Sequence, residues 1–528
     1  IKKISLSDKT TFIYRFNEQD FKLKEGDTAI DISSDTSFGT ITEINEIKDD
    51  ENYIELTIAS KRIAKVGEPP KLFDFGPGPV IGTGAIASAL NKFILNYTDG
   101  DKSKFKCGLD IIKKDYPDLK KIKKGDPIIN DQNDLVEESI EVVKKMNSSY
   151  LLVQGPPGSG KTYTSAKIIL SLLKDNKRIG ITSNSHKAIN NLLHQIEKFA
   201  LEENFSFKGM KKSSKDEDKL KGEIIKDVSG RMKEFPSEYL LHAGTAWLFS
   251  DPRYASKMDY LFVDEAGQVS LANTLAISTS TKNIILIGDQ MQLSQPIQGI
   301  HSGNSGKSSL DFLLGGYDTI PLSRGIFLDV TRRLNEKICD YISSSFYESR
   351  LKSHPVTKDR SVSLELKEIK DEGIFYLPVD HQDCTQKSDE EAKIIKDYYS
   401  KILGKNYTED NKKKKMSIEN IMMIAPFNMQ VNNLKKILNT KEARIGTIDK
   451  FQGQESKVVF ISMTSSDPEN LPRHKEFFFS RNRLNVAISR AECVAVILFN
   501  PNLLLTQCQK INEMRLVNNF CKLLKYEC

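Results

Sequence analysis

The chain has 528 residues, of which 39% are hydrophobic and 28% charged, and 77 Lys and Arg against 71 Asp and Glu give a formal net charge of +6. At about 150 residues per domain, this length indicates three or four domains with packed cores. The longest apolar runs, such as 493–499, are far shorter than the ~20 residues of a membrane-spanning helix, so we expect no membrane partner. Seven cysteines without a C-x-x-C pair exclude a disulfide framework and the common zinc sites, which favours a cytoplasmic location.

The N-terminal residues 1–68 predict a small antiparallel β-barrel. Thr11–Phe16 and Tyr53–Ile58 alternate apolar and polar residues, and Phe38–Ile44 between them is rich in Thr and Ile. Short runs of this kind, separated by Gly and Asp, are typical of such barrels.

Residues 69–128 predict a linker or helical stalk. Proline and glycine punctuate its beginning, and the stretch Lys102–Lys124 is rich in lysine. The lysines are typical of a solvated linker or surface helix, with a specific nucleic-acid contact as the alternative.

From residue 129 the pattern becomes that of an α/β protein, in which short apolar runs alternate with stretches of helical period. The expected strands are 150–153, 179–182, 260–263, 284–287, 421–425, 458–463 and 493–499. Their spacing predicts two parallel-sheet lobes, 129–320 and 321–528. The polar residues 200–238 predict an inserted subdomain in the first lobe, and the lysine run 412–415 predicts a solvated loop.

The sharpest motif follows the first of these apolar runs and matches the phosphate-loop pattern G-x-x-x-x-G-K-[ST]. It consists of Gly155, Pro156, Pro157, Gly158, Ser159, Gly160, Lys161 and Thr162. Glycines let backbone N–H groups curl around phosphates, and the following helix directs its N-terminus at the negative charge. Lys161 is expected to reach the β- and γ-phosphates, and the Thr162 hydroxyl to ligate Mg²⁺.

Two acids and a glutamine follow later apolar runs. Asp264 and Glu265 end the run that begins at Leu261, at the edge of the sheet where the phosphate loop is expected. We expect Asp264 to hold Mg²⁺ and Glu265 to polarise the attacking water, which would make the site a hydrolase. Gln292, after the next strand, is expected to sense the γ-phosphate or to position water.

Arginines in the second half supply positive charge for phosphoryl transfer. Arg332 and Arg333 open a helix-like stretch, and Arg483 and Arg490 lie two helical turns apart on one face. Arginine stabilises the charge that spreads over a transferring phosphoryl group. Supplied by a second lobe, these arginines would make hydrolysis depend on closure of the lobes, as in a motor.

Six ordered motifs, GPPGSGKT, DEAGQ, GDQMQL, TRR, GTIDKFQGQE and NVAISRA, resemble those of the superfamily 1 helicases of the 5′→3′ branch. The resemblance covers residues 135–520. It implies an α/β fold with two RecA-like parallel-sheet lobes, a small N-terminal β-barrel and an inserted subdomain, with ATP and Mg²⁺ as cofactors.

Three further strings, TSNSHKAINNLL, GTAWLFS and SRNRLNVAISRA, are similar to the C-terminal helicase part of bacterial RecB-like nuclease/helicase fusions. We find no nuclease motif here, and the chain begins at Ile1 rather than Met. We therefore expect the motor part of a longer protein, with a nuclease domain before it.

The resemblance also implies roles by position. Gln292 matches the coupling glutamine, Arg333 and Arg490 the γ-phosphate arginines, and Thr162 and Asp264 the metal ligands. Expected near the nucleotide, besides the phosphate loop, are Tyr163, Arg332, Gly453 and Glu455. Gln132 is the candidate for adenine recognition, and the Arg332 guanidinium is a candidate for stacking on the base. The residues implied in nucleic-acid contact are Ser185, His186, Lys187, Thr245, Pro426, Phe427, Gln430 and Thr447.

These features predict an ATP-dependent 5′→3′ helicase or translocase on single-stranded nucleic acid, with DNA favoured over RNA. The alternatives are an ATP-gated nucleic-acid-binding module without unwinding activity and an RNA helicase. Intact Glu265, Arg333 and Arg490 favour hydrolysis over a pure switch. A small-molecule kinase would not explain two lobes. We expect positive potential along a groove near Lys187 and Thr447.

Overall fold

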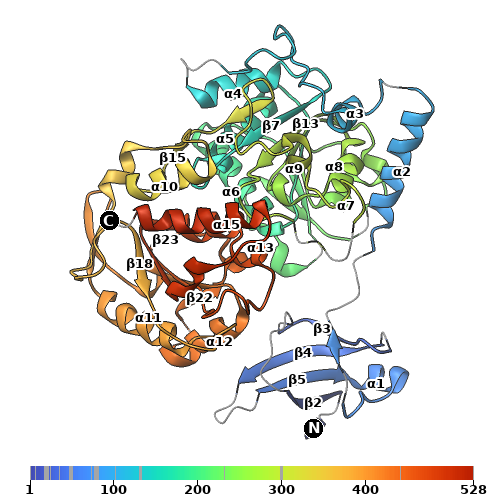
Figure 1. Cartoon of the computed structure of the whole chain (residues 1–528). Coiled ribbons are helices and arrows are strands. Elements are labelled where there is room, and N and C mark those ends of the chain that lie inside the picture. The colour runs from blue at the N-terminus through green and yellow to red at the C-terminus, as the bar shows by residue number, and fades with distance from the viewer. Residues whose placement is uncertain are drawn as a thin grey trace.

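The structure is a computed structural model that describes the chain except for a set of short segments. These are residues 1, 6–7, 17–22, 24, 35, 47–51, 73, 77–81, 102, 130–133, 214, 231, 296, 298–300, 441 and 527–528. Gln132, the candidate for adenine recognition, lies outside the described residues. Figure 1 shows a small N-terminal sheet, a first α/β lobe, and a second α/β lobe that ends with the C-terminus. In the described part of the chain, no helix is long and apolar enough to cross a membrane.

The N-terminal body is a six-stranded sheet in the order β1-β2-β5-β4-β3-β6, with antiparallel pairing throughout. Its elements are β1 (Lys2–Ser5), β2 (Lys9–Phe16), β3 (Thr28–Asp31), β4 (Thr36–Glu46), β5 (Asn52–Ala59), α1 (Ser60–Val66) and β6 (Phe75–Gly76). Alternate residues such as Phe12, Tyr14 and Leu56 bury one face. Among the described residues β1 and β6 do not pair to close a barrel, and β6 extends the sheet beyond the predicted end at residue 68.

In the segment 69–128, predicted as a linker or helical stalk, two helices pack onto the first lobe. These are α2 (Gly84–Thr98) and α3 (Lys106–Lys113), and both contact α8 (Leu271–Ser278). The approach is close, because a Cβ on Gly108 would lie 2.4 Å from the Ser278 hydroxyl. Lys106, in the lysine-rich stretch, donates to Asp110 at 2.9 Å and to Asp118 at 3.0 Å. This lysine therefore has a structural role.

The first lobe is an eight-stranded parallel sheet in the order β10-β9-β11-β8-β12-β13-β7-β14. Its strands are β7 (Tyr150–Gln154), β8 (Ile179–Thr182), β9 (Gly209–Lys212), β10 (Ile225–Val228), β11 (Leu241–Ala243), β12 (Met258–Val263), β13 (Thr281–Gly288) and β14 (Gly325–Phe327). One face is covered by α4 (Leu135–Lys144), α5 (Lys161–Lys174) and α6 (His186–Glu202). The other is covered by α2, α3, α7 (Ala246–Phe249), α8 and α9 (Ser309–Leu314). The central strands are buried on both faces, as their continuous apolar sequences predict.

Two predicted boundaries of this lobe were wrong. Residues 200–238 do not form a separate subdomain, because β9 and β10 continue the sheet and Met210 and Ile225 lie in or at its core. The polar composition concealed these few buried positions; even Lys211 is buried, where its amine donates to Ser213 at 2.8 Å. The lobe also continues beyond residue 320, since β14 pairs with β7 as an edge strand.

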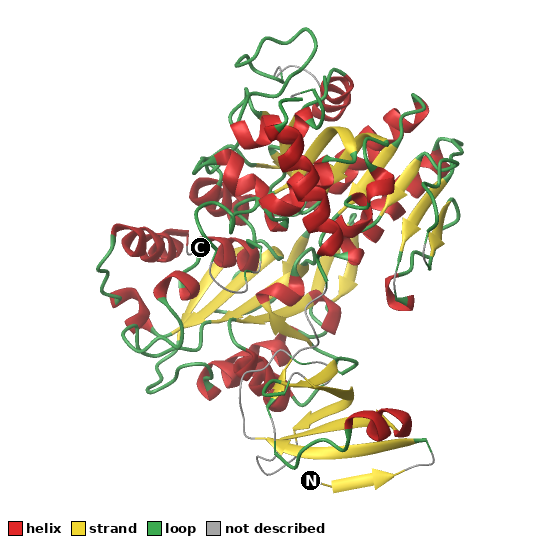
Figure 2. Cartoon of the chain, turned by 90° about the vertical axis from the view of Figure 1, so that its right-hand side faces the viewer, coloured by secondary structure: helices red, strands yellow, loops and turns green. Residues whose placement is uncertain are grey.

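The second lobe is a five-stranded parallel sheet in the order β18-β24-β23-β21-β22. Figure 2 shows the N-terminal strands at the bottom of the view, with the strands and helices of the rest of the chain above them. Its strands are β18 (Gly373–Pro378), β21 (Ile421–Ala425), β22 (Arg444–Thr447), β23 (Ser456–Ser462) and β24 (Ala491–Phe499). One face packs against α11 (Asp389–Ile402) and α12 (Asn428–Leu438). The other packs against α10 (Glu336–Phe346), α13 (Lys475–Phe478), α14 (Arg481–Ile488) and α15 (Ile511–Cys521), and its core is continuous with that of the first lobe.

Short strands complete the second half. β15 (Val330–Thr331) pairs with β16 (Lys352–Ser353), and β17 (Ser361–Ser363), β19 (Asn406–Glu409) and β20 (Lys412–Lys415) form a small sheet. The lysine run was predicted as a loop, but it is the exposed strand β20. Pairing with β19 explains this difference, because backbone hydrogen bonds form whatever the side chains.

A buried polar network fixes helix α11 to the end of β23. The Glu391 carboxylate, which is fully buried, accepts from the Thr464 backbone N–H at 3.0 Å and from the Ser462 hydroxyl. His381 lies 3.1 Å from Glu391 through Nε2 and 2.6 Å from the Ser466 hydroxyl through Nδ1. All these groups are satisfied inside the lobe, so the network is costly to break.

Replacing Glu391 by alanine should lower the free energy of unfolding by about 3 kcal/mol, because it leaves buried polar groups without their partner. Urea unfolding followed by circular dichroism measures the effect. Asp389→Ala is the matched control: it removes an exposed acid from the same first turn of α11 and should change stability by about 0.5 kcal/mol or less. Equal destabilisation by the two substitutions would contradict the role of the network.

Candidate nucleotide site and nucleic-acid interface

The phosphate loop joins the carboxyl end of β7 to the N-terminus of α5. Gly158 and Gly160 have φ of +73° and +83°, which side chains rarely adopt, so glycine is required at both positions. The Lys161 amine lies in the loop, donating to the Gly155 carbonyl and, at 3.4 Å, to the Pro156 carbonyl. Burial lowers the pKa of Lys161, and the carboxylates of Asp289 and Glu265 oppose that shift. The loop thus has the shape and charge of an anion cradle.

The predicted acids lie beside this loop. Strands β12, β13 and β7 are neighbours in the parallel sheet, so Asp264, Gln292 and the phosphate loop all follow carboxyl ends at one edge. Burial, and then the neighbouring Glu265, raise the pKa of Asp264 above its ordinary value. A buried carboxylate with a raised pKa and a second carboxylate next to it fit a divalent cation, which would favour the charged form of Asp264.

Glu265 occupies an unusual backbone conformation at this edge. Its φ is +54°, which is rare for a residue with a side chain and marks a position where surrounding structure enforces strain. Its carboxylate accepts a hydrogen bond of 3.3 Å from Gln452 of the second lobe. The acid expected to polarise water is therefore held from both lobes.

Two other nucleotide candidates lie on α5. Thr162 is half-buried in the first turn, next to Lys161, where a metal ligand is expected. Tyr163 is half exposed, and its ring contacts Phe199 of α6 edge-on, with centroids 5.2 Å apart. The contact that the structure shows for Tyr163 is thus a helix–helix contact.

Gln292 lies in a buried network between the lobes. Its amide donates to the Asp289 carboxylate at 2.8 Å, and Asp289 also accepts from the Tyr347 hydroxyl at 2.6 Å. From α14 of the second lobe, Asn485 donates to Tyr347 at 2.9 Å and Asn482 donates to the backbone carbonyl of Gln292. The loop after β13 is therefore bonded directly to the helix that leads to Arg490.

Arg332 and Arg333 reach the phosphate loop from the segment after β14. The Arg332 backbone N–H donates to the Gly158 carbonyl at 2.9 Å, and the Thr331 hydroxyl donates to the Pro157 carbonyl at 2.9 Å. A Cβ on Gly158 would lie only 2.4 Å from that of Arg333. The Arg332 side chain is exposed, so it is free to stack on a base as the sequence implied.

Glu455 fixes the Arg333 side chain by an ion pair. Burial alone would raise the pKa of Glu455, but the Arg333 guanidinium outweighs it and holds the pKa below its ordinary value. Gly453, two residues earlier, has a φ of +75° and nothing within 4 Å of the position of a Cβ. The turn before β23 therefore places the charged side chain of Glu455 next to the unobstructed backbone of Gly453.

Arg490 is almost completely buried, with 1% of its surface exposed. Its guanidinium donates to the carbonyls of Val486 and Gln454 at 3.0 Å each, and among the described residues no carboxylate forms an ion pair with it. Burial and the neighbouring Arg333 lower the pKa of Arg490 to about 9. A buried cation that forms no ion pair in the described part of the chain has capacity to receive an anion.

The first-lobe candidates for nucleic-acid contact follow the neighbouring strands β8 and β11, at the same sheet edge as the phosphate loop. Ser185 caps α6, where its hydroxyl accepts from the Ala188 N–H at 3.1 Å, and Lys187 is exposed. His186 faces Asp218 at 3.7 Å, and burial lowers the pKa of His186. Thr245 is half-buried at the start of α7.

Of the second-lobe candidates, two are accessible and two are not. Pro426 and Thr447 are half-buried and follow the paired strands β21 and β22. Phe427 and Gln430 are buried, which contradicts the prediction that they touch nucleic acid. Gln430 instead donates to the Ser388 carbonyl and accepts from its N–H, at 3.0 and 2.9 Å. Its position at the start of a helix did not reveal that the side chain faces the core.

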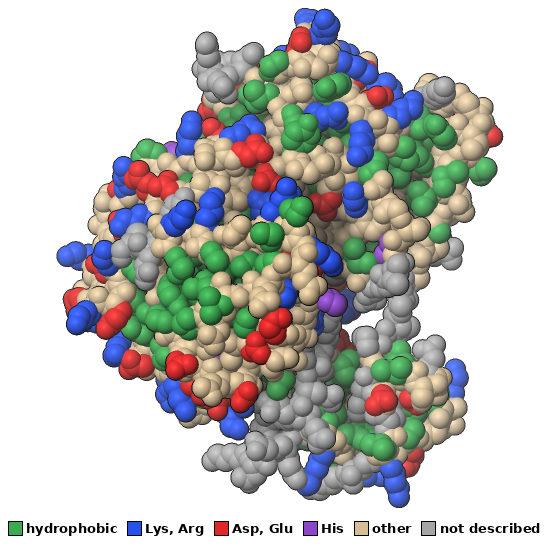
Figure 3. Space-filling model, in the orientation of Figure 1, with side chains coloured by type: hydrophobic (Ala, Val, Ile, Leu, Met, Phe, Trp, Pro, Cys, Tyr) green, Lys and Arg blue, Asp and Glu red, His purple; other side chains and the backbone are tan. Residues whose placement is uncertain are grey.

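Sequence reasoning missed an aromatic residue next to Pro426. Phe477 is half-buried and stacks on Phe427, with ring centroids 6.1 Å apart. The guanidinium groups of Arg473 and Arg483 lie over its ring, 4.5 and 4.2 Å from the ring centre. It lines a small apolar cavity with Pro426. On the face shown in Figure 3, basic and acidic side chains are interspersed and form no single basic patch.

Several residues that join the lobes were also missed. Three of them, Asn482, Asn485 and Gln452, belong to the motifs quoted above. Their short spacing from Arg490 and Glu455 was the only sequence signal that they lie near the nucleotide site. Tyr347 and Asp289 belong to no predicted role, and only the packed structure brings them together.

Two AAA-domain family models match the chain, at residues 139–296 and 319–502. Among curated relatives, the DNA polymerase alpha-associated DNA helicase A of Schizosaccharomyces pombe is 23% identical over 66% of this chain and 61% of its own length. The DNA replication ATP-dependent helicase/nuclease dna2 of the same organism is 25% identical over 74% of this chain and 29% of its own. The ATP-dependent helicase NAM7 of Saccharomyces cerevisiae is 27% identical over 66% of this chain and 40% of its own.

This chain thus spans less than two thirds of the length of each of these relatives. Among solved structures, an arterivirus nonstructural protein 10 helicase with DNA aligns with 67% of this chain and 61% of that chain, at 16% identity and a TM-score of 0.36. The family models cover both halves of the nucleotide site, and its motifs stand in their expected order on two parallel sheets. The chain is thus similar to superfamily 1 helicases, through its two AAA-domain matches and its curated helicase relatives.

Proposed function

We propose that this chain is an ATP-dependent helicase or translocase that moves 5′→3′ on single-stranded nucleic acid, with DNA as the favoured substrate. One observation carries the proposal. The segment Thr331–Arg333 forms a hydrogen bond to the phosphate loop. The helix α14 forms one to the loop after β13. A site built from two lobes in this way couples hydrolysis to their relative position, as a motor requires.

The chain's own residues can perform the hydrolytic step. Lys161 would exchange the loop carbonyls for nucleotide phosphates, and Glu265 would hold the attacking water and accept its proton. Arg333 and Arg490 would stabilise the charge that develops on the transferring group. Gln452 of the second lobe holds Glu265 of the first lobe, and Glu455 fixes Arg333 by an ion pair.

The donor set also fits a magnesium nucleotide. Thr162 and Asp264 would hold Mg²⁺, which when bound neutralises phosphate charge, and the raised pKa of Asp264 reports a site short of positive charge. The Arg332 guanidinium and the open turn at Gly453 would lie along the nucleoside.

The strand path proposed here crosses both lobes. Ser185, Lys187 and Thr245 lie at the carboxyl ends of two neighbouring strands in the first lobe, and Pro426 and Thr447 do so in the second. Phe477, beside Pro426, supplies an aromatic ring of the kind on which bases stack without sequence preference.

The preference for DNA, the 5′→3′ direction and a preceding nuclease domain are inferred from similarity to other proteins. DNA stands in the printed names of two of the three relatives, and the 5′→3′ direction follows from the motif resemblance. A nuclease domain in a longer protein, as in bacterial RecB-like fusions, is supported by the helicase/nuclease relative and by the three quoted strings.

The decisive experiment measures ATP hydrolysis with and without single-stranded DNA and RNA. We expect stimulation by single strands, stronger for DNA, and no hydrolysis by Lys161→Ala. Strand displacement from substrates with 5′ or 3′ overhangs then gives the direction. An unstimulated ATPase would contradict the motor proposal, and stimulation without displacement or translocation would favour the ATP-gated binding module.

Glu265→Gln should retain ATP binding and lose hydrolysis by about 10²–10⁴-fold, because the amide cannot accept the proton from water. Single-turnover hydrolysis and nucleotide binding are measured on the same preparation. Equal loss of binding and turnover would show that Glu265 only maintains the loop.

Arg490→Ala should lower turnover by about a thousandfold or more, as loss of an arginine finger does. Arg483→Ala is the control on α14, which ends two residues before Arg490. Arg483 faces Phe477 and Asp449, so its loss should change turnover by about twofold at most. Thermal unfolding verifies that both variants fold. Similar turnover in the two variants would remove Arg490 from the mechanism.

Lys187→Ala should weaken single-strand binding and reduce the slope of log affinity against log salt by about 0.7, the value for one lost phosphate contact. Fluorescence anisotropy over a salt series measures both quantities. Lys198→Ala removes an exposed lysine from the same helix and should leave the slope unchanged. An unchanged slope for Lys187→Ala would exclude this part of the strand path.

A further inference from the structure

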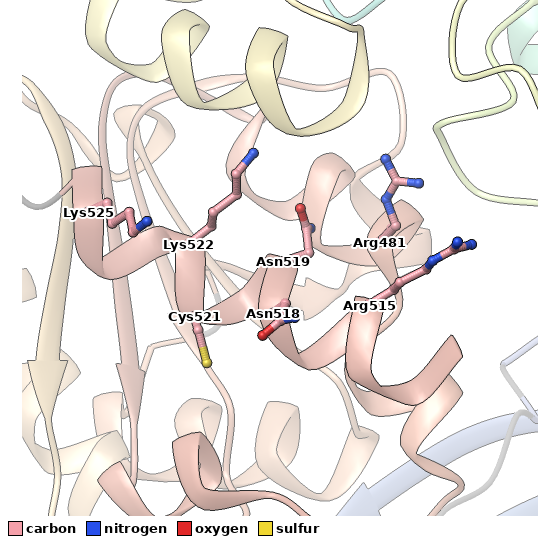
Figure 4. A pocket seen from close by; sticks show the side chains of 7 residues that line it. All are labelled: Arg481, Arg515, Asn518, Asn519, Cys521, Lys522 and Lys525. Carbon is pink, nitrogen blue, oxygen red and sulfur yellow. The ribbon is translucent and has the colours of Figure 1, made fainter. Parts of the chain in front are cut away.

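A basic pocket opens at the C-terminal end of the chain, between α15 and the start of α14. It has a volume of about 490 Å³. Figure 4 shows the side chains that line it: Arg481, Arg515, Asn518, Asn519, Cys521, Lys522 and Lys525. Four of the seven are cationic and none is acidic, so the lining offers an excess of positive charge.

The charges of this lining are only partly compensated. Arg481 pairs with Asp318 of the first lobe at 2.8 Å, and Lys522 donates to the Ser344 carbonyl at 3.3 Å. Arg515 and Lys525 are exposed and form no ion pair or hydrogen bond with any described residue. Two guanidinium or ammonium groups therefore remain available to an anion at the rim.

Asn519 supplies an independent sign of a ligand. Only 8% of the Asn519 surface is exposed. Its side-chain Nδ2 is buried and has no hydrogen-bond partner among the described residues. An unpartnered buried donor costs about 1–3 kcal/mol, and such groups in native structures call for an explanation. Here the amide belongs to the lining of a cationic pocket, where an acceptor from a ligand would satisfy it.

We propose that this pocket binds a phosphate group, with Asn519 as the buried donor and Arg515 and Lys525 as the charged rim. Phosphate oxygens accept from guanidinium, ammonium and amide donors together, which matches the chemistry of the lining. The group comes either from a nucleic-acid backbone or from a free phosphate compound; both share this chemistry.

The pocket is separate from the nucleotide site and from the proposed strand path. The 3₁₀ segment Lys522–Tyr526 that forms its end contacts β18, an edge strand of the second sheet, whereas Thr447 ends β22 at the opposite edge. Arg481 is the first residue of α14, one residue before Asn482, which bonds the loop of Gln292. An anion here would therefore lie at the base of the helix that joins the lobes.

Cys521 allows occupancy of the pocket to be measured directly. It is half-buried in the lining, and Cys384, also half-buried but outside the lining, serves as internal reference. An anion beside Cys521 would block reagent access and disfavour its thiolate, and both effects slow alkylation. Peptide mass spectrometry gives the iodoacetamide rate at each cysteine in the full chain, without nucleotide hydrolysis.

The two ligands tested are inorganic pyrophosphate and an oligothymidylate. At about ten times its dissociation constant, a bound ligand leaves about one site in eleven free, so the Cys521 rate should fall about tenfold. Protection by the oligothymidylate assigns the phosphate to a nucleic-acid backbone, and protection by pyrophosphate alone assigns it to a free phosphate compound. Either result supports the proposal, provided the variants below behave as stated.

The variants separate local binding from changes transmitted from the other sites. The double variant Arg515→Ala/Lys525→Ala should lose protection, and Asn519→Leu should weaken it. Lys413→Ala/Lys415→Ala removes the same charge from the exposed strand β20 and should keep protection. No selective protection of Cys521 by either ligand, or protection that survives in Arg515→Ala/Lys525→Ala, would overturn the proposal.

Discussion

The contact between the phosphate loop and the segment that follows β14 is the constraint on which the rest of this structure depends. Gly158 has no Cβ, so the backbone of Arg332 and Arg333 can lie directly against it. That approach holds Arg333 beside the phosphate loop, where its side chain forms an ion pair with Glu455. The chain thereby uses glycine both for its positive φ and for the space that its missing side chain leaves.

Around this contact, charged side chains are fixed by hydrogen bonds to backbone carbonyls, before any ligand is bound. Lys161 and Arg490 donate to backbone carbonyls, and Asp264 bears a raised pKa because burial and Glu265 both disfavour its charge. These groups are costly without a ligand and become favourable when phosphate and a divalent cation arrive, which is the logic of a preorganised electrostatic site. The same logic applies at smaller scale to the unpartnered amide of Asn519.

The sequence predicted the two parallel sheets, because the continuous apolar runs of their central strands are local signals. It predicted side-chain exposure poorly where local signals are ambiguous. Gln430 follows a strand as a contact residue would, yet the N–H and carbonyl of Ser388, forty-two positions away, hold it in the core. Likewise, the charged residues around Lys211 concealed two strands of the first sheet, since the composition of an edge resembles that of a loop.

The segment that carries Arg333 follows closely on the last strand of the first lobe. Only two residues separate the end of β14 at Phe327 from the start of β15 at Val330. Closing so short a loop costs little chain entropy, so the segment that carries Arg333 has a high effective concentration at the phosphate loop. Families of phosphoryl-transfer proteins that receive an arginine from a separate partner depend on its concentration and timing. In this chain Arg333 is covalently tethered beside the phosphate loop, so its position there follows from the path of the backbone.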